Sequence, residues 1–131
     1  MKKRKKIKHI SLKSLRKKAW DLQSEYIRKS ERGICFTCGV KKRWLEQQAG
    51  HYIHGNRMDF VALNIHCQCP RCNCYLSGNL GVYAERMIAE YGEQAVAELR
   101  EISKQEHKYT IFELEELITK YKTLLEGQIN G

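Results

Sequence analysis

Apolar residues recur at alternating intervals of three and four over residues 12–26, which is the spacing of an amphipathic α-helix. Ser11 stands just before this segment and is a favourable N-cap, and Gly33 predicts the end of the helix. Such a seam has to pack on another apolar surface, in this chain or in a second copy of it, and we expect the intramolecular packing. The apolar positions are Leu12, Leu15, Ala19, Leu22 and Tyr26.

Three further helices are predicted toward the C-terminus. The first covers residues 80–91, and the second runs from 93 to about 108. The third begins at a capping box formed by Thr110 and Glu113 and is expected to end at Gly127. Its apolar face consists of Ile111, Leu114, Ile118, Tyr121 and Leu125.

The segment between the predicted helices lacks helical periodicity. Short apolar stretches at 50–53 and 60–63 predict the two strands of a hairpin, with Gly55 and Asn56 in the turn between them. The expected fold class is therefore α+β and mostly helical, with a hairpin between helical flanks.

Three regions follow from this pattern. Residues 1–32 form a basic tail and amphipathic helix, residues 33–92 form a cysteine-containing core, and residues 93–131 form a C-terminal helical region. At 131 residues the chain can bury only a modest core, so a metal ion bound within it would add useful stability.

Four of the six cysteines occur as two Cys-x-x-Cys pairs separated by a loop of medium length. They are Cys35, Cys38, Cys69 and Cys72. Two such pairs can place four thiolates around one tetrahedral zinc ion, whose coordination is then complete, so the expected role is structural. Disulfides are the alternative, but the paired spacing and the lack of a signal-peptide pattern favour metal binding in a reducing compartment. Cys67 and Cys74 are either buried thiols or spare ligands.

The charge balance points to a polyanionic partner. The chain has 24 Lys and Arg against 15 Asp and Glu, for a net charge of +9, and nucleic acid is the first candidate. Six of the basic residues lie in residues 1–10, which form either a solvated tail or an arm that grips phosphates. An anionic membrane surface is the second candidate, but no run is long enough to span a bilayer, and the expected partner is DNA without a membrane.

Particular side chains are candidates for the contact with DNA. Trp20, Trp44 and Tyr52 are candidates for stacking on exposed bases, although core packing is the simpler role for Trp20. The candidates for phosphate contacts are Arg16, Lys17, Lys18, Lys41, Lys42, Arg43, Arg57 and Arg71.

One histidine and two asparagines have the chemistry and the order needed for phosphodiester hydrolysis. His51 is the candidate general base, because an imidazole takes up a proton near neutral pH. Asn73 directly follows a zinc ligand and offers an amide oxygen to a hard ion such as Mg²⁺. Asn64 is expected to hydrogen-bond across the loop and hold the strand that carries His51. Singly, each is more commonly structural, and the argument rests on the three together within the cysteine frame.

These residues resemble the HNH endonucleases, also called His-Me finger or ββα-metal nucleases. In that family a strand carries the histidine, a loop the first asparagine and a helix the last one, at positions that match His51, Asn64 and Asn73. The ending Cys-x-x-Cys-Asn is also similar to phage endonuclease VII. A closer resemblance is to the NinG/Rap recombination endonuclease family of lambdoid phages, over about residues 30–125. It is carried by residues 35–39, 49–52, 64–73 and 77–79.

The resemblance implies a zinc-stapled ββα-metal core flanked by an N-terminal basic helix and C-terminal helices. It implies a divalent-metal-dependent DNA endonuclease that cleaves branched recombination intermediates such as Holliday junctions and D-loops, with Mg²⁺ or Mn²⁺ as the catalytic ion. Such a phage or prophage protein would act in the cytoplasm of the bacterial host. Because a four-way junction is nearly two-fold symmetric, a homodimer is expected.

One position departs from the HNH pattern. Many of these enzymes have an acidic residue directly before the catalytic histidine as a second ion ligand, and this chain has Gly50 there. His54, Asp59 and His66 are the candidates to replace it. The alternative function is a non-catalytic zinc-containing DNA-binding or recombination adaptor protein, in which the histidine and asparagines only shape the fold. An RNA-associated zinc ribbon fits the charge but gives no reason for the ordered His and Asn positions.

Overall fold

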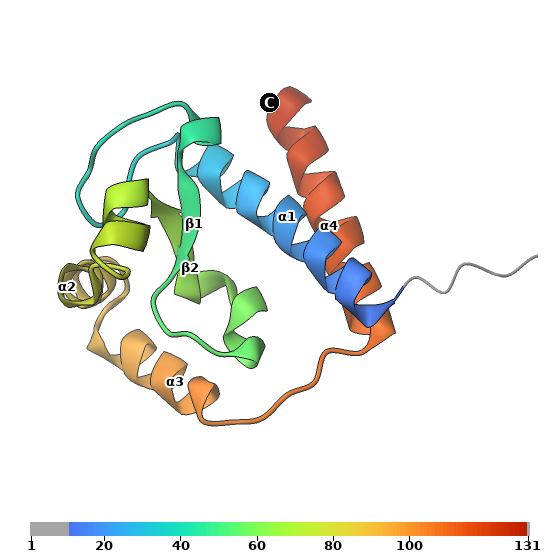
Figure 1. Ribbon diagram of the computed structural model, residues 1–131. Helices are drawn as coiled ribbons and strands as arrows, with labels where there is room; N and C mark the ends of the chain where they lie inside the picture. Colours follow the sequence, from blue (N-terminus) through green and yellow to red (C-terminus); the bar gives the residue numbers. More distant parts are fainter. Residues whose placement is uncertain (1–10, 131) are drawn as a thin grey trace, which may run out of the picture.

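A computed structural model describes residues 11–130 of the chain, and the predicted basic arm at 1–10 lies outside the described residues. A two-stranded hairpin lies in the middle of the molecule, with one long helix pair on one side and two shorter helices on the other (Figure 1). The mostly helical α+β class is confirmed. The elements are α1 (Leu12–Ser30), β1 (Gln48–His51), β2 (Ile65–Gln68), α2 (Leu80–Tyr91), α3 (Glu93–Ser103) and α4 (Ile111–Asn130).

Helix α1 begins and ends at the predicted signals. The Ser11 hydroxyl accepts a hydrogen bond from the Ser14 N–H at 3.1 Å, as an N-cap does. After the helix, Gly33 adopts a φ of +68° and donates its N–H to the Arg28 carbonyl at 3.0 Å. A Cβ at this position would overlap the carbonyl of Lys42, so the turn requires glycine.

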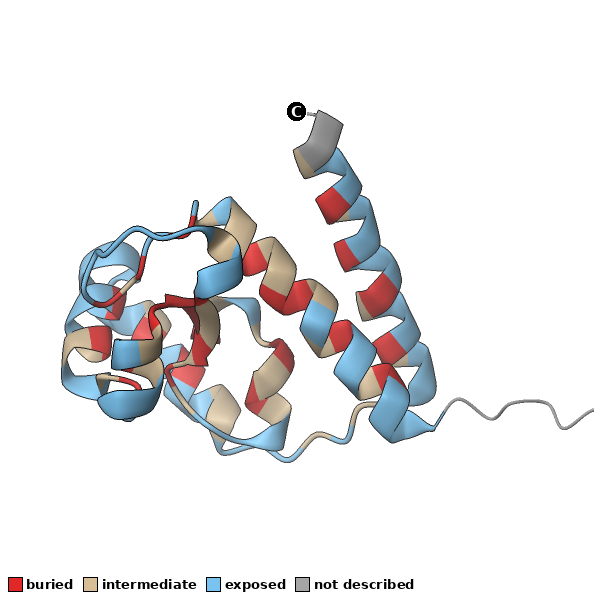
Figure 2. Cartoon of the chain, turned by 45° about the horizontal axis from the view of Figure 1, so that its top comes forward, coloured by how far each residue is buried: buried red, intermediate tan, exposed pale blue. Residues whose placement is uncertain are grey.

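Helices α1 and α4 pack along each other through their apolar seams, which confirms the intramolecular packing (Figure 2). The Tyr121 hydroxyl on α4 donates to Gln23 Oε1 on α1 at 3.0 Å, which pins the two helices in register. Leu12 and Ile111, both expected in the seams, are about half exposed at the start of each helix. The predicted seam positions that are buried are Leu15, Ala19, Leu114, Ile118, Tyr121 and Leu125.

The C-terminal helices match the prediction except at two ends. Helix α2 has the predicted bounds, and the capping box of α4 forms, with Thr110 and Glu113 exchanging hydrogen bonds of 3.1 Å. Helix α3 ends at Ser103 rather than near 108. The linker that follows it contacts the β1–β2 connection, where the Tyr109 hydroxyl donates a hydrogen bond to the Arg57 carbonyl. The predicted end of α4 at Gly127 is wrong, since glycine within a helix costs only about 1 kcal/mol and the chain stays helical to residue 130.

The hairpin differs from the prediction in both strands, since β1 begins and ends two residues before the predicted 50–53 and the second strand lies elsewhere. Strand β1 pairs antiparallel with β2, with Gly50 opposite His66 and His51 opposite Ile65. The predicted strand at 60–63 is wrong, because that segment lies in two short 3₁₀ helices within the connection between the strands. Phe60, which looked like a strand residue, is buried instead against the α1–α4 core.

A second apolar cluster joins the β1–β2 connection to α2 and α3. Its buried members are Tyr52, Met58, Tyr83, Met87, Val96 and Leu99. From this cluster the Tyr83 hydroxyl donates to the carbonyl of Gly50 at 2.8 Å. Helix α2 is thereby tied to β1 at the residue before His51, so the functional candidates lie on a well-supported strand.

Within residues 11–130 none of the helices combines the length and the apolar character that a bilayer span requires.

Candidate functional site

The four predicted zinc ligands come together. Their sulfur atoms all lie within 4.8 Å of one another, and Cys38 Sγ and Cys69 Sγ are 3.7 Å apart. Four sulfurs at about 2.3 Å from a tetrahedral zinc are about 3.8 Å apart, so the cluster fits that ion. In each pair the backbone N–H of the second cysteine points at the sulfur of the first, at 3.5 Å for Cys35 and 3.4 Å for Cys69.

The ionisation of these thiols also fits a cation site. Burial opposes ionisation of Cys35, but hydrogen bonds from Thr37 and from nearby backbone amides lower its pKa to about 6. Burial and the neighbouring thiols raise the pKa of Cys38 to about 12. The protein alone thus favours one thiolate over several, and a divalent cation would allow all four to ionise.

Cys67 and Cys74 do not belong to this cluster. Cys67 is fully buried in β2, and burial raises the pKa of its thiol to about 12, as expected for a packed, unreactive side chain. Cys74 is exposed, and its thiol donates to Gln48 Oε1 at 3.2 Å.

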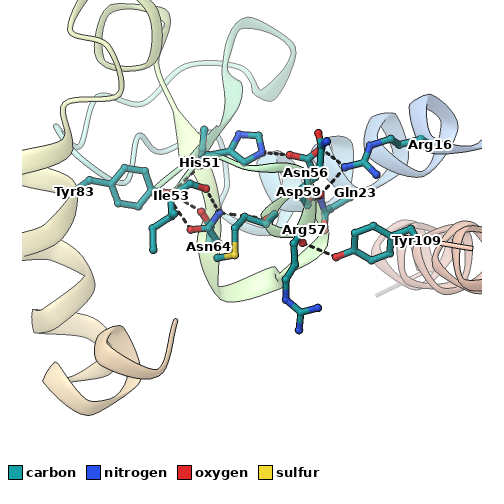
Figure 3. Close-up of polar contacts among 12 residues, drawn as sticks. Arg16, Gln23, His51, Ile53, Asn56, Arg57, Asp59, Asn64, Tyr83 and Tyr109 are labelled. Carbon is teal, nitrogen blue, oxygen red and sulfur yellow. Dashed lines mark hydrogen bonds and ion pairs between the residues drawn. The ribbon is translucent and has the colours of Figure 1, made fainter. Parts of the chain in front are cut away.

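His51 stands at the end of β1, and its ring points toward Asp59 (Figure 3). Its Nε2 lies 2.8 Å from Asp59 Oδ1. The ring stacks nearly parallel on that of Trp20, with centroids 4.9 Å apart, and the ring of His54 lies 5.2 Å away. Trp20 therefore connects α1 to the histidine, a contact that the helical spacing of Trp20 did not predict.

Asp59 is an ionised carboxylate shared between two partners. Oδ1 faces His51, and Oδ2 pairs with Arg16 Nη2 at 2.7 Å, as Figure 3 shows. Burial works to raise the pKa of Asp59, but the hydrogen bonds from His51 and Arg16 outweigh it and lower the pKa below the usual value. Both carboxylate oxygens have protein partners, so neither is free for an ion in this conformation, and the ligand role suggested for Asp59 stays a prediction.

Asn64 closes the connection that carries Asp59. It is fully buried, its Oδ1 accepts the Ile53 N–H and its Nδ2 donates to the Ile53 carbonyl, each at 2.8 Å. A further bond of 3.3 Å reaches the Met58 carbonyl. This is the cross-loop hydrogen bonding expected from the sequence, and it fixes the strand end beside His51.

Asn73 lies in a single π-helical turn, Arg71–Tyr75, that directly follows the second cysteine pair. Its Nδ2 donates to Gln48 Oε1 at 2.7 Å, and its Oδ1 faces Gly50. Alternate residues of a strand face opposite sides, so Asn73 packs on the Gln48 and Gly50 side of β1 and His51 projects from the other. Asn73 therefore packs beside Gly50, the strand residue next to His51. The two side chains hydrogen-bond to different partners, His51 to Asp59 and Asn73 to Gln48.

His66 and His54 differ in their surroundings. His66 is buried, with Nδ1 at 3.0 Å from Glu31 Oε2, Nε2 at 3.1 Å from the Leu63 carbonyl, and its ring stacked on Phe36. Both ring nitrogens are therefore engaged within the fold, and the ion-ligand role suggested for His66 stays a prediction. His54 is exposed beside His51.

The candidate DNA contacts fall into separate regions. Lys41, Lys42 and Arg43, here called the basic loop, are exposed and line an open hollow with Trp44 at the end of α1. Lys17 and Lys18 are exposed nearer the N-terminal end of α1, and Lys17 forms an ion pair with Asp21. Arg16 forms an ion pair with Asp59, the aspartate beside His51. Arg71 is exposed, and Arg57 is half-buried in the β1–β2 connection.

The aromatic candidates are less available than expected. Cations of α1 cover Trp44, with Arg28 Cζ at 5.0 Å and Lys29 Nζ at 4.7 Å from its ring centroid. Stacking of Tyr52 on a base is contradicted, because its ring is buried and its hydroxyl accepts a hydrogen bond from Arg100.

The chain is therefore a mostly helical α+β protein, with a two-stranded hairpin and a four-cysteine cluster suited to zinc. Residues 1–128 match the family described as Bacteriophage Lambda NinG protein. The chain is 32% identical over 121 residues to Protein ninG of Escherichia phage lambda, covering 88% of this chain and 57% of that protein. It is 32% identical over 116 residues to Protein ninG of Salmonella phage P22, covering 84% and 55%.

This chain therefore belongs to the NinG family of lambdoid phage proteins. It spans somewhat more than half the length of the relatives that it matches. No solved structure matches it.

Proposed function

We propose that this chain is a divalent-metal-dependent DNA endonuclease that cleaves branched recombination intermediates, Holliday junctions and D-loops. One observation carries the proposal. His51 is held by an ionised aspartate at the end of β1, and Asn73 packs against the preceding residue of the same strand. A binding protein without catalysis has no evident need for this pairing.

His51 is the proposed general base. Its Nε2 is engaged by Asp59, and its Nδ1 has no hydrogen-bond partner among residues 11–130, which leaves that nitrogen to take a proton from water. The carboxylate then stabilises the imidazolium that forms. Because the pKa of Asp59 is held below its usual value, the carboxylate is charged at the pH of the reaction.

The general base His51 and the ion ligand Asn73 need not face each other if the phosphodiester is cleaved by in-line displacement at phosphorus. The attacking water and the departing 3′ oxygen lie on opposite sides of the phosphorus, so groups that serve them approach from two directions. Successive strand residues are about 3.3 Å apart and face opposite ways, so a phosphate at the edge of β1 would reach both sides.

The donor set around Asn73 suits a hard ion. Amide oxygens are ligands that Mg²⁺ and Mn²⁺ accept, and Asn73 is fixed by the adjacent zinc ligand Cys72 and by Gln48. Bound there, such an ion would stabilise negative charge on the phosphate and the leaving oxygen. The zinc, coordinated by four cysteines, would hold the turn that carries Asn73.

The substrate class comes from the resemblance to recombination endonucleases, and the charge supports a DNA partner. The basic loop 41–43 lies at the C-terminal end of α1, while His51 contacts Trp20 in its middle, so duplex DNA lying along α1 would reach both. Two symmetric sites would suit a four-way junction, and a homodimer is part of the proposal.

The alternative is a non-catalytic zinc-containing DNA-binding or recombination adaptor protein. The observation in its favour is that His51 and Asn73 both have partners inside the protein, on separate sides of β1. Under this alternative the two residues only stabilise the hairpin.

A cleavage assay separates the two functions. Zinc-loaded protein is mixed with a synthetic four-way junction and Mg²⁺ or Mn²⁺, and His51→Ala and Asn73→Ala are compared with wild type. We expect junction binding to persist and cleavage to fall by about 10²–10⁴-fold for the histidine variant. The matched control is His107→Ala, which removes another histidine paired with a carboxylate, Glu113 at 2.7 Å. Junction binding without any cleavage by wild type would favour the adaptor.

A further inference from the structure

Gly50 leaves space that is filled by another side chain. A Cβ built at this position would overlap Gln68 Oε1 and would lie 2.9 Å from Asn73 Oδ1. Gln68 reaches this point from β2, where it pairs with Gln48 in the strand register. Two amide oxygens therefore converge at the position from which an acidic side chain would project in many HNH enzymes.

The oxygen of Gln68 is buried and unpaired. The side chain is fully buried, and Oε1 has no hydrogen-bond partner among residues 11–130. Its Nε2 donates to the Gly78 carbonyl at 2.9 Å and to Thr37 Oγ1 at 3.2 Å. Because a carbonyl can only accept, the amide nitrogen must face Gly78, and the oxygen must face Gly50. A buried carbonyl oxygen without a donor is uncommon and needs an explanation.

The neighbouring oxygen of Asn73 also has no hydrogen-bond partner among residues 11–130, although the Asn73 side chain is only half-buried. Its amide nitrogen is used on Gln48 Oε1, so Oδ1 is the atom turned toward Gln68. Both oxygens lie within about 3 Å of one point, the Cβ position of Gly50, and two ligands of one ion at about 2.1 Å are at most about 4.2 Å apart, so the pair is near the spacing that a shared ion requires. Two acceptors with no donor between them attract a cation and disfavour another acceptor.

We propose that Gln68 Oε1 and Asn73 Oδ1 bind one divalent cation, with Gln68 replacing the acidic ligand that Gly50 lacks. The catalytic role of that ion rests on the proposed nuclease function, but the binding site does not. Both ligands are neutral, so binding without DNA is weak, with a Kd on the order of 1 mM, and phosphate oxygens strengthen it.

Paramagnetic broadening by Mn²⁺ measures such weak binding and locates it. In zinc-loaded, DNA-free protein, substoichiometric Mn²⁺ should broaden the backbone amide signals of residues 50, 68 and 73 before any others. Asn73→Ala and Gln68→Met should abolish this local broadening. The matched control is Gln47→Met, because Gln47 is another buried glutamine whose Oε1 has no partner among the described residues.

A second variant covers the case in which Gln68→Met fails to fold. Gln68→Glu keeps the shape and adds charge, so it should tighten Mn²⁺ binding by roughly tenfold. Zinc content and the circular dichroism spectrum establish that each variant is folded. Unchanged broadening in folded Gln68→Met, unchanged affinity in Gln68→Glu, or wild-type broadening only at other residues would overturn the proposal.

Cleavage measured on the same samples keeps this inference apart from the proposed function. If wild type cuts junctions while Gln68→Met binds Mn²⁺ normally, the nuclease stands and the role of Gln68 is wrong. If Mn²⁺ binding depends on Gln68 but wild type cuts no DNA, the cation site stands and the nuclease is wrong.

Discussion

Asp59→Asn is the substitution that tests the support of His51 most sharply. It keeps the size of the side chain and removes the charge that faces the imidazole at 2.8 Å. An amide in this place can still accept a hydrogen bond, so the position of the ring is largely retained. What is lost is the attraction between a carboxylate and the imidazolium that forms when His51 takes a proton.

The size of the loss follows from the exposure of the pair. A hydrogen bond involving charged groups contributes about 1.5–3 kcal/mol when shielded from water. The side chains of His51 and Asp59 are 17% and 28% exposed, and screening at that exposure leaves about 1–2 kcal/mol. At about 1.4 kcal/mol for each factor of ten, the cleavage rate should fall roughly 5- to 30-fold.

The assay is single-turnover cleavage of a four-way junction by excess zinc-loaded protein, with junction affinity measured separately. We expect the rate constant to fall at unchanged affinity.

The matched control is Glu113→Gln, which neutralises a carboxylate 2.7 Å from His107, far from β1 along the chain. It should leave the rate unchanged. A rate within twofold of wild type for folded, zinc-containing Asp59→Asn would refute this account of His51. So would an equal loss in the control.

The remaining predictions address the metal, the charges and the assembly. Cys69→Ser should lose zinc and fold together, since structural zinc sites contribute about 10 kcal/mol or more, and a variant with full zinc content by colorimetric assay would contradict this. Alanine at all of residues 41–43 should weaken junction binding and reduce the slope of log K against log salt by roughly 2–3, whereas an unchanged slope would exclude the basic loop from the interface. The carboxyl ¹³C signal of Asp59 should titrate below 3.8, so the stability that it adds is present above that pH and fades only as pH falls through the lowered pKa. Its midpoint should rise in Arg16→Ala, and a wild-type midpoint at or above 3.8 would contradict the assignment. Sedimentation with junction DNA should show two chains per junction, and one chain at micromolar concentration would argue against a dimer.

The helices and the cysteine cluster could be predicted from local pattern. Seams at three-and-four spacing, the N-cap Ser11 and the capping box at Thr110 depend on neighbours in sequence, and all of them form. Two Cys-x-x-Cys pairs likewise need only spacing to indicate a shared ion, and their sulfurs do converge.

The second strand and the surroundings of His51 could not be predicted in the same way. The apolar run at 60–63 looks like a strand, but Phe60 is buried by α1 and α4, which are distant in sequence. Arg16 and Trp20 reach His51 and its aspartate only because α1 packs across the hairpin. Gln68 lies in a segment that carries the family resemblance, but the sequence assigned it no role, since its proposed role depends on an oxygen that has no partner among the described residues of the packed structure.

Chemical rescue tests the central claim most directly. Replacing His51 by glycine removes the ring between Asp59 and Trp20 and leaves space in which free imidazole can bind. With zinc content and junction affinity unchanged, we predict that His51→Gly cleaves junctions about 10²–10⁴-fold more slowly than wild type and that added imidazole raises the rate in proportion to its concentration. Cleavage at the wild-type rate without imidazole, or a slow rate that imidazole does not raise, would contradict the assignment of His51 as the base.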